Sequence, residues 1–352
     1  MTLLVRPARQ LGRPFARAAV VATGVVMACL AGSEPASADP ARPTNYQSTV
    51  TAISPAADGV DVNIIGGDAY VVLQAAAGVT VEVAGYDGEP YLRFDADGTV
   101  RVNDRSPARW LNDERFGVPG TEIPASVDPE APPQWRIVAS DGKYAWHDHR
   151  IHFMSPQLPR DIDVTIRQQQ RVFEWSIPMI IDGAPVEVHG ELFWLPPPPA
   201  GAVVAQAGAA VILVVGLIGF AGWWPAVAAV TLVALTIGVG GGVGLPAGAD
   251  WDVAQLVLPT VALVLGGGGW LMRRRADKLP VPPMVVALLP VVPMGVWAVV
   301  LAPALVQPIV PGAVAAGLVR SGTVAAAMIV VAGMALTMNP AWRHHLEAAI
   351  RQ

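Results

Sequence analysis

Uninterrupted apolar runs dominate the chain after residue 200. Each run is close to the ~20 apolar residues that an α-helix needs to cross a hydrocarbon layer of ~30 Å. The pattern therefore predicts a transmembrane bundle of about five helices over residues 201–338, followed by a tail at 339–352. The predicted spans are 203–221, 226–245, 253–272, 281–304 and 313–338.

Before residue 195 the pattern changes to short alternating segments separated by turn residues. Pairs such as Asp58-Gly59, Asp97-Gly98 and Asp182-Gly183 recur through this half, and Asx-Gly pairs supply the positive φ that tight hairpins need. The pattern predicts an all-β, immunoglobulin-like antiparallel sandwich over residues 39–194. The predicted strands are 47–53, 60–65, 70–74, 79–83, 91–94, 100–103, 136–139, 144–152, 162–168, 173–178 and 186–194.

Two segments interrupt these patterns. Residues 103–134 have little periodicity and many prolines, so we expect a long ordered excursion from the sheet. Residues 195–200 contain four consecutive prolines after Leu195, and such a run forms a stiff polyproline spacer. We therefore expect 195–200 to be the linker between the two domains.

The first 38 residues have the features of a signal peptide. Four arginines precede an uncharged apolar stretch at 18–30, and Ala36-Ser37-Ala38 fits the rule for cleavage before Asp39. The alternative is a lipoprotein box at 26–29 that would lipidate Cys29, although Met27 is unusual in such a box. Cys29 is the single cysteine, so its removal would exclude disulfides, thiolate metal sites and cysteine nucleophiles.

Charge placement predicts the orientation of the spans. Basic residues cluster between the third and fourth spans and after the fifth, and cytoplasmic loops carry an excess of Lys and Arg. We therefore expect a multi-pass plasma-membrane protein with an extracytoplasmic N-terminal domain and a cytoplasmic C-terminus. The basic residues are Arg273, Arg274, Arg275, Lys278, Arg343 and Arg351.

Two features stand out inside the spans. Pro290 and Pro293 predict a kink in the fourth span, because each proline removes a backbone donor. Arg320 lies near the outer end of the fifth span, where we expect it to reach the headgroups. The alternative is a functional charge inside the membrane.

Composition limits the function classes. Residues 39–200 carry 12 Lys and Arg against 23 Asp and Glu, an acidic balance that disfavours nucleic acid and favours cations or basic partners. No nucleophile elbow, phosphate loop or HExxH motif is present in the sequence. We therefore expect no enzyme, no catalytic residues and no organic cofactor.

One histidine-rich segment carries candidate chemistry. On a strand, His147 and His149 would share a face roughly 7 Å apart, which suits binding of one ion. His152 would join them only if a bulge or turn intervened, and Met154 would then lie on its side. His189 is a possible fourth ligand. Imidazoles with a thioether and a carboxylate suit copper, and zinc less exclusively. The alternative is that these side chains form a solvated strand face or orient the excursion.

Two resemblances accompany these motifs. The segments 85–94, 143–154 and 182–194 resemble a family of actinobacterial membrane proteins, a likeness that implies the architecture and no activity. The segments 173–177 and 182–186 resemble, more weakly, the final hairpin of CopC-type periplasmic copper-resistance β-sandwiches. That family implies copper-binding histidines after the Asp-Gly pair and at the mature N-terminus. This chain has Ala184 and Asp39 there, so the resemblance extends to the fold and not to the ligands.

Together these observations predict a membrane-anchored extracytoplasmic binding module, with the lipid bilayer and a transition metal as partners. The alternative function is an envelope protein that recognises another protein, with neither metal nor catalysis. No nucleic-acid partner is expected.

Overall fold

The computed structural model describes residues 40–113, 115–116, 123–273 and 283–338. The predicted signal peptide at 1–38, Cys29, the cleavage site before Asp39 and the tail at 339–352 lie outside the described residues. So do Arg274, Arg275 and Lys278 of the basic cluster.

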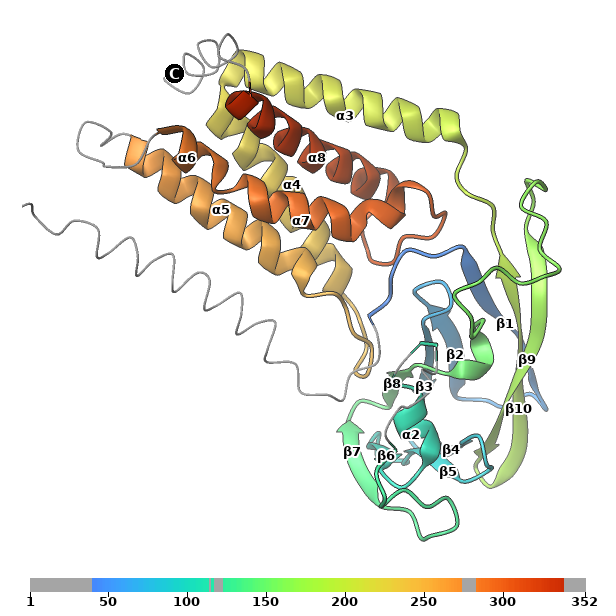
Figure 1. The fold of residues 1–352 in the computed structure, drawn as a ribbon. Helices are drawn as coiled ribbons and strands as arrows, with labels where there is room; N and C mark the ends of the chain where they lie inside the picture. Colours follow the sequence, from blue (N-terminus) through green and yellow to red (C-terminus); the bar gives the residue numbers. More distant parts are fainter. Residues whose placement is uncertain (1–39, 114, 117–122, 274–282, 339–352) are drawn as a thin grey trace, which may run out of the picture. The chain divides into compact units, whose positions relative to one another are not determined.

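Ten strands in the described residues form two antiparallel sheets (Figure 1). The larger sheet has seven strands in the order β1-β10-β9-β4-β5-β6-β7, and the smaller has three in the order β2-β3-β8. The strands are β1 (Tyr46–Ser54), β2 (Val60–Ile65), β3 (Tyr70–Ala75), β4 (Val81–Ala84), β5 (Pro90–Phe94), β6 (Val100–Asn103), β7 (Trp135–Ala139), β8 (Lys143–Trp146), β9 (Gln170–Ile181) and β10 (Ala184–Trp194).

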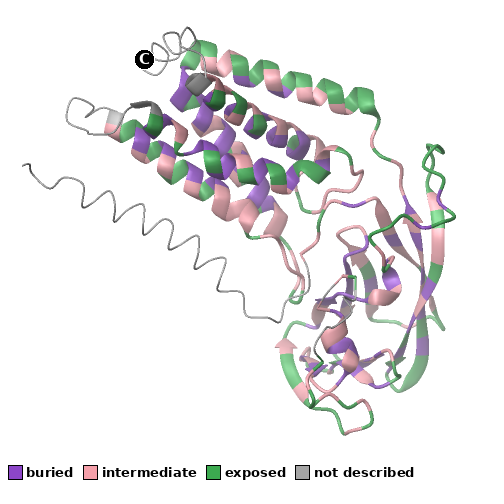
Figure 2. Ribbon diagram, in the orientation of Figure 1, coloured by how far each residue is buried: buried purple, intermediate pink, exposed green. Residues whose placement is uncertain are grey.

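The core of this domain follows from side-chain alternation. Along β10, Val186, Val188 and Leu192 are buried while Glu187 and Glu191 are more exposed, because successive side chains of a strand point to opposite faces. From the smaller sheet, Leu73 and Trp146 join the same apolar cluster. The buried faces of the two sheets therefore share one core (Figure 2).

A glycine allows the closest packing in the larger sheet. A Cβ on Gly190 would lie 2.0 Å from the Trp175 ring, so no other residue fits. The Trp175 indole N–H in turn donates to the Ser48 hydroxyl at 2.7 Å. This contact ties β9 to β1 across β10.

Most predicted strands are confirmed within a few residues, two are wrong, and the immunoglobulin-like arrangement is not confirmed. Residues 162–168 form turns, in which the Asp163 side chain accepts from Thr165. The strand predicted at 144–152 ends at Trp146. The seven-plus-three division of strands is not the four-plus-three arrangement of an immunoglobulin domain. In the excursion at 103–134, residues 114 and 117–122 lie outside the described residues, and the described part contains a short helix, α2 (Pro107–Leu111).

The described part of the C-terminal half contains five helical segments long and apolar enough to cross a membrane, as predicted. The fourth segment is broken at Leu289–Pro290, which confirms the predicted irregularity at the first of its two prolines. Pro293 lies in the first turn of the next helix, where a missing N–H is tolerated. The helices are α3 (Ala200–Ala221), α4 (Trp223–Gly242), α5 (Ala254–Arg273), α6 (Pro283–Leu288), α7 (Val291–Leu301) with the 3₁₀ turn η3 (Ala302–Leu305), and α8 (Ala316–Met338).

Arg320 differs from the expectation of a side chain that reaches outward. It is only 9% exposed, and its guanidinium donates to the carbonyls of Ala304 (2.8 Å), Gln307 (3.0 Å) and Pro308 (3.4 Å). The last carbonyls of a helical segment lack intrahelical partners and attract a cation. Arg320 therefore caps the end of η3 and fixes α8 to it.

We predict that Arg320→Met lowers the free energy of unfolding by about 2 kcal/mol or more, because hydrogen bonds to a charged donor are lost and buried carbonyls stay unpaired. SDS titration of the purified chain, followed by circular dichroism, measures the change. Thr236→Val, which removes one exposed hydroxyl from α4, is the control and should leave the midpoint nearly unchanged. An unchanged midpoint for Arg320→Met would contradict the capping role.

Candidate functional site

The histidine segment is shaped by a buried carboxylate. After β8 ends at Trp146, Asp148 caps a 3₁₀ turn, η1 (His149–Ile151). Its Oδ1 accepts from the Arg150 backbone N–H (3.0 Å) and Nε (2.8 Å), while Oδ2 accepts from Arg150 Nη2 (2.8 Å) and the Trp146 indole N–H (2.9 Å). Burial raises the pKa of Asp148, but the Arg150 charge and these hydrogen bonds outweigh it and hold that pKa below its usual value.

This turn gathers the three histidines. The ring centroids are 4.6 Å apart for His147 and His152, 5.3 Å for His149 and His152, and 6.3 Å for His147 and His149. The expectation that His147 and His149 share the face of a strand is wrong, since β8 ends before them. The turn needed for His152 to join them is present.

Two of the three rings have nitrogens without partners. His147 and His152 are almost fully buried, and both ring nitrogens of His147 and Nδ1 of His152 have no hydrogen-bond partner in the described part of the chain. His152 Nε2 lies 2.6 Å from the carbonyl oxygen of Arg115. A carbonyl only accepts, so Nε2 carries the hydrogen and the lone pair of His152 is on Nδ1.

Both buried rings are neutral near pH 7. Burial lowers the pKa of His152 to about 3, helped by the nearby charge of Arg115. Burial, His152 and Arg115 lower the pKa of His147 well below its ordinary value. Neutral imidazole is the form that binds metal ions.

The third ring is held from the other side. Tyr86 stacks on His149 with ring centroids 5.9 Å apart, and the Tyr86 hydroxyl accepts the His149 backbone N–H at 2.8 Å. Arg150 lies over the same tyrosine ring at 5.2 Å and donates to the Ala84 carbonyl. The histidine turn is thereby fixed to the end of β4.

The structure adds two residues to the site that sequence reasoning missed. Asp68, in the β2–β3 turn, is fully buried, and its Oδ2 pairs with the Arg115 guanidinium. Its Oδ1 has no partner among the described residues. Burial raises the pKa of Asp68 to about 6, against the lowering effect of Arg115. No motif marks either residue, because they lie in separate loops of the sequence.

The other predicted ligands lie elsewhere. Met154 is 37% exposed, and its neighbour Phe153 packs against Tyr46. His189 is on the outer face of β10, 3.5 Å from the Glu187 carboxylate. The Asp148 carboxylate is occupied by its four hydrogen bonds. The structure therefore gathers His147, His149 and His152 but neither Met154 nor His189.

A metal site is not already formed. Within the described ranges, no group of three or more His, Cys, Asp or Glu side chains is arranged to hold a metal ion as it stands. The ring spacing is nevertheless suitable. If three imidazole nitrogens hold a metal at about 2.0–2.1 Å in tetrahedral geometry, their ring centroids are roughly 5 Å apart.

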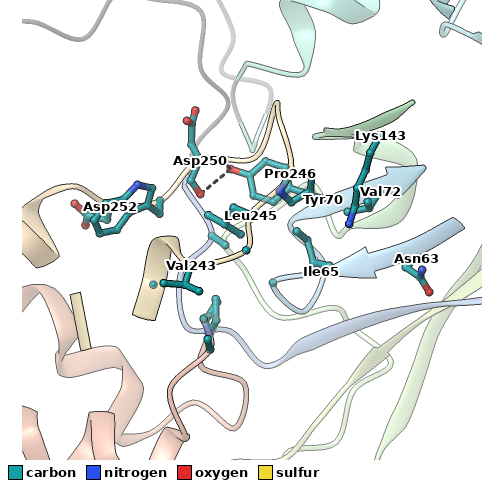
Figure 3. Close-up of a pocket in the computed structure, with 18 of the residues that line it drawn as sticks. Asn63, Ile65, Tyr70, Val72, Lys143, Val243, Leu245, Pro246, Asp250 and Asp252 are labelled. Atoms are coloured by element: carbon teal, nitrogen blue, oxygen red, sulfur yellow. Dashed lines mark hydrogen bonds between the residues drawn. The ribbon is translucent and has the colours of Figure 1, made fainter. Parts of the chain in front are cut away.

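The site borders the loop between α4 and α5, and the described residues from Pro40 onward belong to one compact unit. The Tyr70 ring meets His147 edge-on at 5.8 Å. Its hydroxyl accepts from the Asp250 N–H (3.2 Å) and donates to the Asp250 carbonyl (3.4 Å). Figure 3 shows Tyr70 joined to Asp250 by a hydrogen bond. The Ala145 N–H bonds to the Ala247 carbonyl at 2.8 Å. Tyr70 therefore separates His147 from a cavity of about 550 Å³ that this loop helps to line.

Comparison of the chain with protein-family models, curated protein sequences and solved structures finds no match.

We predict that the metal-free protein loses stability as the pH falls from 7 toward 4. In the unfolded chain the histidines take up protons near pH 6.5, whereas His147 and His152 resist protonation in the folded state. Below pH 6.5 each of the two therefore lowers the free energy of unfolding by about 1.4 kcal/mol per pH unit. Asp68 opposes this slope between its ordinary pKa and about 6. Thermal unfolding of the chelator-treated chain at stepped pH should show a smaller slope for His152→Gln. His189→Gln is the control, and an unchanged slope in His152→Gln would refute the prediction.

Proposed function

We propose that this chain is a membrane-anchored binding module that holds one transition-metal ion, copper or zinc, through His147, His149 and His152. The observation that carries the proposal is the set of partnerless nitrogens on His147 and His152, two rings in contact within the core.

The cost of burying these nitrogens without hydrogen bonds indicates that a binding partner is missing from the site. A buried polar atom left without a hydrogen bond costs about 1–3 kcal/mol, and such atoms in native structures call for an explanation. One bound cation would provide a partner for a nitrogen of His147 and for Nδ1 of His152 at once. The backbone carbonyl of Arg115 fixes the tautomer of His152, as second-shell acceptors do for metal-binding histidines.

The donor set also limits which metal ions the site would bind. Three imidazoles suit copper and zinc, and the thioether of Met154 is not needed. We expect no catalysis from this arrangement, and the proposal assigns none.

The proposal places the two-sheet domain outside the cytoplasm. It rests on the signal-peptide features of residues 1–38 and on the basic residues that follow the third and fifth spans. The protein is then a multi-pass plasma-membrane protein whose C-terminus is cytoplasmic.

The second candidate is recognition of an envelope protein without metal. Strand β7 ends the larger sheet, and its Ile137 is 59% exposed. An exposed edge strand of this kind can pair with a strand of another chain.

For the metal proposal we predict micromolar or tighter binding of Cu²⁺, Cu⁺ or Zn²⁺ to the purified full-length chain, measured by calorimetric titration in detergent. The double variant His147→Ala/His149→Ala should lose this binding. His189→Ala and Met154→Leu are matched controls and should bind as the parent does. A folded parent that binds none of the three ions would remove the metal function and leave protein recognition as the better proposal.

For the orientation we predict that a membrane-impermeant maleimide labels Ser140→Cys in intact cells, because Ser140 is exposed on the two-sheet domain. Ala276→Cys, between the third and fourth spans, should be labelled only after permeabilisation. The opposite labelling pattern would overturn the proposed orientation.

A further inference from the structure

Arg115 lies where the partnerless groups meet. Its guanidinium pairs with buried Asp68, its backbone carbonyl accepts from His152, and its charge acts on both His147 and His152. In the described part of the two-sheet domain, the buried side-chain atoms without partners all belong to Asp68, His147 and His152. Among the described residues, Arg115 thus contacts Asp68 and His152 directly, and its charge acts on His147.

A second buried pair shows that this is not the ordinary outcome of an Asp–Arg contact. Asp148 and Asp68 are both fully buried, and their arginines are similarly covered, with side chains 18% and 20% exposed. Asp148 accepts four hydrogen bonds, and its pKa is lowered. Asp68 keeps one oxygen without a partner, and its pKa is raised to about 6. The Asp68–Arg115 pair is thus incompletely satisfied in a way that the Asp148–Arg150 pair is not.

We propose that the Arg115 guanidinium holds the place of a divalent metal ion, and that loading displaces it so that Asp68 becomes the fourth ligand beside the three histidines. This inference rests on the proposed metal function and deepens it.

The exchange leaves the site with one more positive charge than before. The guanidinium leaves with one positive charge and moves to solvent, where its side chain is already partly exposed. The metal brings two positive charges to a carboxylate and three neutral imidazoles. Only the side chain of Arg115 needs to move, because its carbonyl still holds Nε2 of His152. The arrangement also accounts for the lack of a formed metal site in the described residues.

The fourth ligand sets the choice of metal. A carboxylate oxygen is a hard donor that favours divalent ions, whereas Cu⁺ prefers thiolate and thioether ligands. With three imidazoles and one carboxylate, the site should select Zn²⁺ and Cu²⁺ over Cu⁺.

The test is a set of competition titrations with a chromophoric chelator on the full-length chain in detergent, using Zn²⁺ and Cu⁺ as probes. Arg115→Gln should bind Zn²⁺ several-fold more tightly than the parent, because the internal competitor is gone. Arg115→Lys, which keeps the charge, should bind close to the parent. Asp68→Asn should bind Zn²⁺ at least tenfold more weakly, with a smaller loss for Cu⁺. Arg160→Gln and Asp161→Asn, both exposed, are the controls.

Stability measurements protect the test against folding artefacts. Without metal, Arg115→Gln should be less stable than the parent, because buried Asp68 loses its counter-charge. Added Zn²⁺ should raise the stability of the variant again, because it binds the folded state. Weaker or equal Zn²⁺ binding by folded Arg115→Gln would overturn the inference, as would parent-like binding by Asp68→Asn. If those variants bind like the parent while His147→Ala/His149→Ala does not bind, the metal function stands and this inference fails. A parent that binds neither probe, and binds no Cu²⁺ in the calorimetric titration, overturns both.

Discussion

The site depends on the buried carboxylate of Asp148. The negative charge of Asp148 caps the turn that ends β8. If the strand continued instead, His147 and His152 would point to opposite faces of the sheet. Four donors converge on the carboxylate from Trp146 and Arg150, which are its near neighbours in sequence. Because the donors are local, the turn forms with little loss of chain entropy. The same arginine then bonds to the Ala84 carbonyl and joins the turn to the larger sheet.

The consequence reaches beyond the histidines, because the smaller sheet is also attached to the helical half. Tyr70 lies between His147 and the backbone of Asp250, and β8 bonds to the loop between α4 and α5 through Ala145 and Ala247. A second backbone contact between the two halves pairs Thr44 with Ile309. The candidate site is thus held by two sheets and by a loop that connects two spans. His147 is connected to that loop through the Tyr70 ring and its hydroxyl.

The fold could be predicted from the sequence wherever one physical rule acts alone. Alternation placed most strands, and apolar length placed the five spans. The failures arise where rules compete. Residues 144–152 alternate as a strand would, but the Asp148 cap outweighs that preference after Trp146. His189 shares its register with polar Glu187 and Glu191, so alternation itself assigns it to the outer face of β10. Asp68 and Arg115 meet only through tertiary structure, and no local pattern marks them.

Three arginines in buried positions show how the surroundings decide the role of a charge. Arg320 satisfies carbonyls at a helix end, and Arg150 satisfies a carboxylate that has no unused acceptor. In both cases the buried charge and its acceptors are hydrogen-bonded, so each of these arginines is structural. Arg115 meets this condition only in part, since Asp68 keeps an oxygen without a partner, and Nδ1 of His152 also lacks one although its Nε2 bonds to the Arg115 carbonyl. A folded chain tolerates such a deficit where a ligand can later remove it. The incomplete pair is therefore the physical difference between an arginine that holds the fold and one that can give way to an ion.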